Sequence, residues 1–478
     1  MAGQTLHEFS YIPSDARMPK LAVALDSLLM AVRFQQLLFA NEQVNLSERY
    51  EVTACSIERI KYRAGEKCVI SYRLQIKPFG QENTEEQWFC ARLFPTGTAE
   101  GRYRKALREP LSPPRFGDAV MYLAELDMVI WAFPNDRKIA GLPTLMATAA
   151  WKNSQLGEIV AATWGRATTI TAHQFTLVHY VPEHTCTVRV DLTLQKPDRQ
   201  IPNQVTLFGK AYYDEEGAES YRLMQRLWFS PICRRGNLRI AQPLAYDPAA
   251  RLLWQLGLPG HTLLTYELGS TLFAELLGEA ARAVALLHAA ALPCQRTTAQ
   301  REWVELIGSR RDLVARVCPH LVSAVDTVVT ALRCLVPPQS QEPVATLHGD
   351  LHLQNFFVDE AAAVGQRLAL IDLDNLSTGS PWRDLGSFCA SLYYRGLVDD
   401  VEPSTIRRTI DQFLASYAQH APWPLDRQAI DWYIAAALLN ERAFRSISRM
   451  KQGRVAMVGD FLRIATELLL GQMAQNRT

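Results

Sequence analysis

The sequence predicts an α+β protein in which two β-rich stretches of similar design precede a long helical region. Three observations predict this class. Apolar and polar residues alternate in residues 57–94, the same strand–turn–strand order returns in residues 175–213, and helical periodicity dominates after Pro259. The 478 residues leave room for roughly two to four domains. We therefore expect two β-rich lobes and one helical lobe.

The expected elements follow the spacing of the apolar residues. Turns are predicted at Ala64-Gly65-Glu66 and Pro182-Glu183-His184, where short polar stretches separate two alternating runs. The predicted strands are residues 57–62, 68–76, 87–94, 175–180, 186–194 and 205–213, and the predicted helical segments are residues 19–45, 99–107, 142–163, 217–228, 263–292, 301–335 and 406–473.

The two β-rich stretches match each other at a constant offset of 118 residues. Tyr62 meets Tyr180 and Arg92 meets Lys210, and the strand, turn and helix order is the same in both. Tyrosine is scarce in this chain, and the alignment needs no gap. The match therefore predicts an internal duplication of a small β-rich lobe.

The composition excludes several classes of protein. Lysine and arginine number 50 against 49 aspartates and glutamates, so the net charge gives no footprint for nucleic acid or an anionic membrane. The nine cysteines form no CxxC pair, which favours reduced thiols in a reducing compartment. No secretory signal or apolar run of about 18 residues is found. We expect a cytoplasmic protein with no nucleic-acid or membrane partner.

The most informative segments are LHGDLHLQNFFV (residues 347–358) and LALIDLDN (residues 368–375). The apolar runs FFV and LALI predict two short strands of a hairpin. Asp350 and Asn355 then lie on the loop before the first strand, and Asp372 lies at the end of the second. We therefore expect these three polar side chains to converge at one mouth.

Phosphoryl transfer requires such a set of side chains. Catalysis of this reaction comes from positioning and charge neutralisation rather than from covalent chemistry by the protein. One carboxylate must accept or orient the proton of the attacking hydroxyl, and oxygen ligands must hold a divalent cation against the phosphates. Asp350, Asn355 and Asp372 supply these groups.

The motif His348-Gly349-Asp350-xxxx-Asn355, followed by Ile371-Asp372-Leu373-Asp374, resembles the aminoglycoside phosphotransferase family, to which choline kinases are related. The segment GSPWRDLG (residues 379–386) resembles the family's G-x-P-x-x-D-L segment. The resemblance covers residues 169–470. It implies a bilobal protein-kinase-like fold, with a β-rich nucleotide lobe and a helical C-lobe, and the use of ATP and Mg²⁺.

The resemblance also implies residue roles. Asp350 matches the catalytic base, and Asn355 and Asp372 match the magnesium ligands. His348 and Asp384 match residues that support the loop. Asp374 is interpreted as a second carboxylate near the metal or as a structural group.

In the nucleotide lobe, Lys210 matches the lysine of the third strand that binds phosphate. Glu219 is the first candidate for its ion-pair partner, with Glu215, Glu216 or no partner left open. Gln255 and Gly257 resemble the hinge that holds adenine, and residues 182–185 form the turn expected to cover the phosphates.

The first β-rich stretch departs from the family pattern. Arg92 replaces the lysine, and no catalytic loop follows, so this copy is interpreted as a degenerate lobe used for substrate capture, regulation or homodimerisation. The expected domains are a helical segment (1–48), the degenerate N-lobe-like repeat (49–140), a helical spacer (141–168), the nucleotide-binding N-lobe (169–262) and the helical catalytic C-lobe (263–478).

The predicted function is transfer of the γ-phosphoryl group of ATP to a hydroxyl of a small molecule, such as a sugar, an amino alcohol, an aminoglycoside-like compound or a natural-product intermediate. An aminoglycoside acceptor calls for an acidic pocket, and the chain has no strongly acidic cluster. The alternatives are a pseudokinase or nucleotide-binding regulator, and a transferase of AMP or one directed at proteins. Residues 432–445 are expected either to pack as a plain helix or to face the acceptor.

Overall fold

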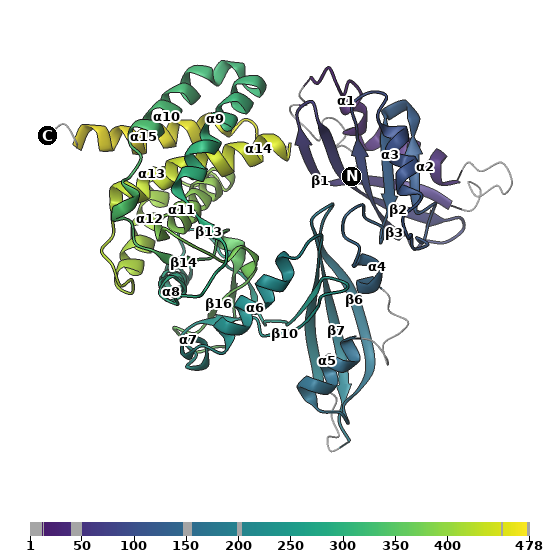
Figure 1. Cartoon of the computed structure of the whole chain (residues 1–478), viewed down its shortest axis with the longest axis horizontal. Coiled ribbons are helices and arrows are strands. Elements are labelled where there is room, and N and C mark those ends of the chain that lie inside the picture. Colours follow the sequence, from purple (N-terminus) through teal and green to yellow (C-terminus); the bar gives the residue numbers. More distant parts are fainter. Residues whose placement is uncertain are drawn as a thin grey trace.

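The computed structural model describes residue 12 and residues 14–39, 50–146, 155–197, 203–450 and 453–475. Figure 1 shows two β-rich lobes next to each other, coloured purple to blue and teal, and a helical part beside both, coloured green to yellow. The protein contains both sheets and helices in the predicted order, so the α+β class is confirmed.

The first lobe is a five-stranded antiparallel sheet preceded by two helices. Its strand order is β1-β2-β3-β5-β4. The elements are α1 (Leu21–Ala24), α2 (Ser27–Phe39), β1 (Tyr50–Arg63), β2 (Lys67–Pro78), β3 (Glu85–Leu93), α3 (Ala99–Ala106), β4 (Val120–Leu123) and β5 (Met128–Ala132). The predicted strands of this lobe are confirmed, while residues 40–45 of the predicted helical segment lie outside the described residues.

The second lobe repeats this design. Its sheet has the order β10-β11-β8-β7-β6, which is the order of the first sheet when the strands are matched from one end. The elements are α4 (Leu142–Met146), α5 (Gln155–Trp164), β6 (Thr169–Val181), β7 (Thr185–Gln195), β8 (Asn203–Tyr212), α6 (Glu216–Trp228), α7 (Pro231–Arg234), β10 (Pro243–Asp247) and β11 (Leu252–Leu256). The shared strand order agrees with a duplication, which itself stays a prediction.

The two lobes share part of their hydrophobic core. Side chains from one face of the first sheet, such as Val69 and Trp131, join a single cluster with Val188, Val190 and Trp254 of the second. Burial of a continuous apolar cluster is the dominant stabilising contribution in such a contact. The first lobe is therefore packed on the second rather than joined to it by a linker alone.

The C-terminal part combines two small sheets with a helical bundle. The sheets have the orders β12-β15-β16-β9 and β13-β17-β14. Strands β9 and β12 come from the segment expected to belong to the nucleotide lobe, yet they pair with β16 and β15. The elements are β9 (Arg239–Ile240), β12 (His261–Thr262), α8 (Thr271–His288), β13 (Thr297–Thr298), α9 (Gln300–Val317), α10 (Val322–Cys334), β14 (Ala345–Leu347), β15 (Phe356–Val358), β16 (Leu368–Leu370), β17 (Ser377–Gly379), α11 (Pro381–Val398), α12 (Pro403–Ala418), α13 (Arg427–Ala437), a π-helix (Leu438–Ala443), α14 (Phe444–Ser448) and α15 (Val458–Gln475).

Two helix predictions in this part were wrong. The helix predicted from residue 263 begins at Thr271, because Ser270 caps it by accepting a hydrogen bond from the Phe273 amide at 3.1 Å. The helix predicted over residues 301–335 is two helices. It is interrupted at Cys318-Pro319, where the proline removes a backbone donor.

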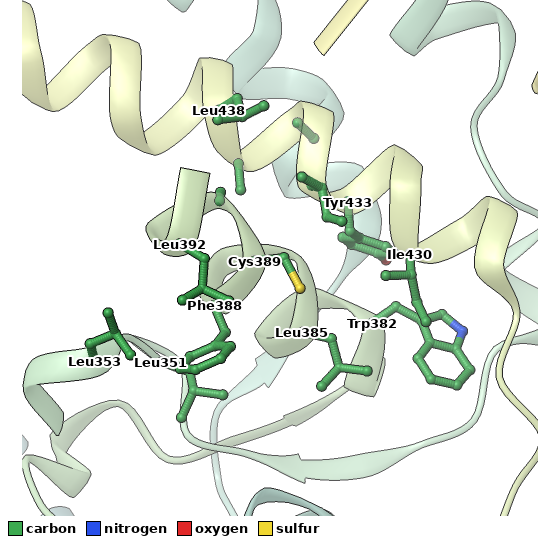
Figure 2. Packing of buried hydrophobic residues seen from close by; sticks show 14 of the residues in the cluster. Leu351, Leu353, Trp382, Leu385, Phe388, Cys389, Leu392, Ile430, Tyr433 and Leu438 are labelled. Carbon is green, nitrogen blue, oxygen red and sulfur yellow. The ribbon is translucent and has the colours of Figure 1, made fainter. Parts of the chain in front are cut away.

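Helix α11 forms the centre of the C-terminal core. Figure 2 shows Phe388 of α11 beside Leu351 and Leu353, which lie on the loop before β15, and α13 passes above them. Phe388 and Leu351 have no exposed surface. Truncating such a side chain to alanine costs about 3–5 kcal/mol, so this core holds the loop firmly in place. No helix among the described residues is both long and apolar enough to cross a lipid bilayer.

Candidate active site

The predicted hairpin is confirmed, and it brings the three motif residues together. Strands β15 and β16 are antiparallel, with Phe356 opposite Leu370. Asn355 directly precedes β15, and its carbonyl accepts a hydrogen bond from the Ile371 amide at 3.0 Å. Asp372 follows β16 in a left-handed conformation, with φ of +57°. Non-glycine residues adopt this conformation mainly where the surrounding structure requires it, often at functional sites.

The buried carboxylate of Asp384 supports the loop that contains His348, Gly349 and Asp350, here called the HGD loop. Asp384 at the start of α11 accepts hydrogen bonds from the His348 amide at 2.6 Å and from the Gly349 amide at 3.0 Å. The imidazole of His288, which is also buried, lies 3.2 Å from the same carboxylate. Burial acts to raise the pKa of Asp384, but these partners outweigh it and the pKa is lowered. The contacts of Asp384 are those of a group that supports the loop.

Two further contacts tie the HGD loop to the segment after β16. The His348 imidazole lies 2.9 Å from the carbonyl of Ile371. Gly349 has φ of +82°, and a Cβ at this position would lie 2.2 Å from the carbonyl oxygen of Asn375. Only glycine fits so close an approach, which explains the middle residue of the motif.

Asp350 lies between the hairpin and the C-terminal helices. Its carboxylate is 3.1 Å from the Arg445 guanidinium and 3.6 Å from the His352 imidazole, and its backbone carbonyl accepts a hydrogen bond from Asn355 Nδ2 at 2.8 Å. Burial acts to raise its pKa, but His352 and Arg445 lower it well below the ordinary range. Asp350 is therefore ionised at neutral pH.

Lys210 on β8 reaches across to the segment after the hairpin. Its ammonium group lies 2.7 Å from Asp372 Oδ1 and forms a second ion pair with Asp374. The hydroxyl of Tyr212 donates to Asp374 at 2.7 Å. Burial acts to lower the pKa of Lys210, but the two carboxylates raise it overall, and Lys210 in turn lowers the pKa of Asp372. The site thus holds a protonated lysine beside the ionised carboxylate of Asp372.

The expected pair between Lys210 and Glu219 is not formed, so this prediction was wrong. Glu219 binds Arg222 one turn along α6, with the Arg222 Nε donating at 2.7 Å, and it accepts a hydrogen bond from the Gln295 amide. The i,i+3 spacing on the helix favours this local pair. Glu216, which was left open as an alternative, is near enough to Lys210 for the lysine to act on its pKa.

The hinge residues lie where β11 ends, but their backbone is partly engaged. The amide of Gly257 donates to the Thr206 carbonyl at 2.8 Å, and Gln255 pairs with Phe208 and Pro243 within the sheet. The Gly257 amide is therefore not free to bind an adenine ring. Adenine recognition by Gln255 and Gly257 stays a prediction, and the Gly257 amide is excluded from it.

The turn expected to cover the phosphates is held by the first lobe. Glu183 lies in this turn, between β6 and β7, and its carboxylate is 2.8 Å from Arg92, 2.6 Å from Arg137 and 3.5 Å from Lys67. The sequence singled out Arg92, because this residue occupies the position that matches Lys210. It did not reveal that Glu183 is the partner of Arg92.

A cavity of about 390 Å³ is lined by several arginines, and two of its lining residues, His352 and Arg445, contact the carboxylate of Asp350. Arg442 and Arg445 come from the π-helix and from α14, and Arg449 follows directly. A π-helical turn often marks a functional site because it changes which side chains face inward. Of the face predicted at residues 432–445, the structure places Trp432 and Asn440 in the core and turns the two arginines into the cavity. Helical spacing alone could not separate these two groups.

The side chains of Asn355 and Asp372 offer oxygen atoms of the kind that a divalent cation prefers. In the described part of the chain, no three His, Cys, Asp or Glu side chains gather as a metal site. Magnesium bound with a nucleotide needs only one or two protein ligands, because phosphates and water complete the octahedron. Asn355 Nδ2 is engaged with Asp350, which leaves Oδ1 as the free amide acceptor, and the Asp372 side chain is 41% exposed.

Comparison with protein families confirms the predicted resemblance. Residues 198–423 match the model of the phosphotransferase enzyme family. This segment contains all the site residues predicted from the motifs, from Lys210 to Asp384. It leaves out the first lobe and the arginines after residue 440. No curated protein sequence matches the chain.

Several solved structures of phosphotransferases and kinases are also similar to this chain, with low TM-scores. A putative aminoglycoside phosphotransferase from Ralstonia eutropha JMP134 is 15% identical, with 66% of this chain and 98% of that chain covered and a TM-score of 0.47. Choline kinase LicA from Streptococcus pneumoniae is 14% identical, with 66% and 100% covered and a TM-score of 0.39. The aminoglycoside phosphotransferase APH(3'')-Id from Streptomyces rimosus is 17% identical, with 59% and 96% covered and a TM-score of 0.37.

Proposed function

We propose that this chain is a phosphotransferase that moves the γ-phosphoryl group of ATP to a hydroxyl of a small molecule. The observation that carries the proposal is the meeting of Lys210 from β8 with Asp372 and Asp374 beyond the hairpin. This meeting joins the second β-rich lobe to the segment after β16, and both lie in the part of the chain that matches the phosphotransferase family model.

The charge states in the site support this assignment. Lys210 stays protonated beside its carboxylates, and Asp372 stays ionised beside Lys210. A protonated lysine is required to bind phosphate oxygens, and an ionised carboxylate is required to bind Mg²⁺. When bound, Mg²⁺ neutralises charge on the phosphate oxygens, and Asn355 and Asp372 are the residues that would hold it.

Asp350 takes the position of the group that receives the acceptor hydroxyl. It is ionised, and its backbone is fixed by Asn355 and by the supported HGD loop. A carboxylate of low pKa is a weak base toward a free alcohol. Its contribution is therefore to accept a hydrogen bond from the hydroxyl, orient it for attack, and take its proton as the bond to phosphorus forms.

The test compares Asp350→Asn and Asp372→Asn with an exposed control, Asp312→Asn on α9. Each variant is incubated with Mg²⁺ and ATP labelled at the γ-phosphate together with a pool of hydroxylated metabolites, and label transfer is measured. Asp350→Asn should lower transfer by about 100- to 10,000-fold and leave ATP affinity nearly unchanged. Asp372→Asn should weaken ATP binding in Mg²⁺ specifically, and Asp312→Asn should change neither quantity.

The same experiment separates the alternatives. Product mass distinguishes a gain of phosphate from a gain of AMP. ATP binding without transfer in any fraction of the pool would support the pseudokinase alternative. Full transfer activity in Asp350→Asn would contradict the base assignment.

A further inference from the structure

The cavity beside Asp350 has an unusual balance of charge. Its lining includes five arginines and one carboxylate, that of Asp399. Asp399 is already paired with Arg395 on the same helix. The other four arginines therefore give the cavity a positive interior that the lining itself does not neutralise. They are Arg442, Arg445, Arg449 and Arg454.

The partners of these four arginines differ. Arg445 is 3.1 Å from Asp350, and Arg442 is 3.8 Å from Glu441. For Arg449 and Arg454, no carboxylate of the described residues lies within ion-pair distance. Two of the four guanidinium groups thus have no anionic partner in the described part of the protein.

Neighbouring arginines add to the positive charge of the cavity. Burial, together with Arg59 and Arg445, lowers the pKa of Arg449 to about 10. Arg59 comes from β1 of the first lobe, where it also contacts His179 at 3.0 Å. Crowded like charges destabilise a folded protein unless a bound anion offsets them. The cavity is therefore electrostatically complementary to an anion.

Aromatic contacts hold two of the guanidinium groups in place. The Tyr394 ring lies between Arg442, at 5.9 Å from its centroid, and Arg454, at 5.0 Å. Arginine presents a planar fork of donors that matches phosphate or carboxylate oxygens in pairs, and fixing the plane lowers the entropy lost on binding. The volume of about 390 Å³ is within the range of pockets that take small molecules.

We propose that the acceptor is an anionic hydroxyl compound, whose phosphate or carboxylate group binds Arg449 and Arg454 while its hydroxyl lies against Asp350. This inference rests on the proposed phosphotransferase function, because the hydroxyl is assigned to the end of the cavity formed by His352 and Arg445, the two lining residues that contact Asp350. A cationic acceptor such as an aminoglycoside would meet repulsion from the four arginines. The transfer step forms the bond from the acceptor oxygen to the γ-phosphorus, breaks the bond to ADP, and passes the hydroxyl proton to Asp350.

The first test uses the full-length chain saturated with Mg²⁺ and a non-hydrolysable ATP analogue, so that the phosphate site at Lys210 is filled. Inorganic phosphate, and separately acetate, is titrated by calorimetry. Phosphate binding should weaken at least tenfold in Arg449→Gln and Arg454→Gln, and by a smaller factor in Arg449→Lys, which keeps the charge but loses the paired donors. The control Arg408→Gln, on the exposed face of α12, should bind as the wild type does. Equal binding in all variants, or no binding to the wild type, would overturn the proposal.

A second test needs no variant and separates this proposal from the function itself. The wild type is given glycerol, glycerol 3-phosphate, glyceric acid, choline and kanamycin, and the stabilisation of each mixture with the nucleotide analogue is measured by thermal unfolding. Stabilisation by the anionic compounds and by neither cation is expected. Stabilisation by choline or kanamycin alone would overturn the anionic acceptor while leaving the kinase intact. If the wild type did not bind the nucleotide analogue in the presence of Mg²⁺, the proposed function itself would be wrong.

Discussion

The two β-rich lobes place a cation at the same position and direct it to different targets. Arg92 on β3 and Lys210 on β8 are 118 residues apart and occupy matching strands of sheets with the same order. Lys210 reaches Asp372 and Asp374 beyond the hairpin, whereas Arg92 reaches Glu183 in the turn of the second lobe. In each case the side chain pairs with a carboxylate outside its own sheet, in the lobe that follows along the chain.

The turns of the two lobes share a more detailed design. In the first lobe, Asp15 accepts hydrogen bonds from the Tyr62 hydroxyl at 2.9 Å and the Gly65 amide at 2.7 Å. In the second lobe, the same contacts are made by Asp136, Tyr180 and Glu183. The two turn residues, Gly65 and Glu183, both have positive φ.

The decisive difference is the side chain at the turn. Gly65 presents none, while Glu183 presents a carboxylate that gathers Arg92, Arg137 and Lys67. Two sheets of the same strand order thus differ in the role of the matching cation, which reaches the candidate phosphate site in one lobe and the neighbouring turn in the other. We therefore interpret the first lobe as a support for the predicted nucleotide lobe rather than as a second active site.

The largest expected effect comes from removing the two matching cations. Lys210→Met should raise the Kd for ATP with Mg²⁺ by about 10- to 100-fold, because it removes a charge-assisted contact and leaves Asp372 and Asp374 to repel the phosphates. Arg92→Met should change the Kd by less than about threefold, because the ion-pair partner of Arg92 is Glu183 in the turn and not a group of the candidate phosphate site. Calorimetry on both variants measures this. A larger loss in Arg92→Met would mean that the nucleotide site is in the first lobe.

The second prediction concerns the carboxylate at the turn. Glu183→Gln leaves three cations without a partner and should cost about 2–3 kcal/mol of unfolding free energy, less than for a fully buried pair because the cations keep some contact with water. Burial acts to raise the pKa of Glu183, but hydrogen bonding to Arg137 and the charges of Arg92 and Arg137 lower it from 4.5 to about 2.

The sign of the pH dependence follows from this shift. A pKa lowered in the folded state means that the ionised form stabilises the fold, and the contribution is complete above about pH 4.5 and lost as the pH falls toward 2. The difference in unfolding free energy between wild type and Glu183→Gln should stay constant from pH 7 to 5 and shrink below that. A difference that does not change with pH would show that the ion pairs do not support the turn.

The parts of the fold predicted correctly were those with local signals. The hairpin around residues 356–370 follows from two apolar runs separated by a short connection, and it places Asn355 and Asp372 at its two ends. The matched strands of the two lobes follow from alternation of period two. The pattern of apolar and polar residues therefore predicted where most of the candidate site residues lie, and the resemblance to the family supplied their expected roles.

The parts missed depend on contacts between distant segments. The pairing of Glu183 with Arg92 joins residues 91 positions apart, and Arg445 reaches Asp350 from 95 positions away. The resemblance to the family made Glu219 the first candidate partner of Lys210, but Glu219 pairs with Arg222 on the same helix. The pairs of Glu183 with Arg92 and of Arg445 with Asp350 are decided by tertiary packing, which no local sequence pattern reveals.

The smallest expected effect tests whether the shared turn design has the same weight in both lobes. Asp15→Ala and Asp136→Ala each remove an acceptor for a tyrosine hydroxyl and a turn amide, so each should cost about 1–3 kcal/mol in chemical denaturation. Of the two aspartates, Asp136 is the one that contacts the turn of the predicted nucleotide lobe. Asp136→Ala should therefore also weaken ATP binding a few-fold, while Asp15→Ala should not. Tyr62→Phe and Tyr180→Phe, which remove one donor each, serve as milder controls. If both aspartate variants weakened ATP binding equally, the first lobe would contribute to the nucleotide site through its own turn, and its role as a support alone would be wrong.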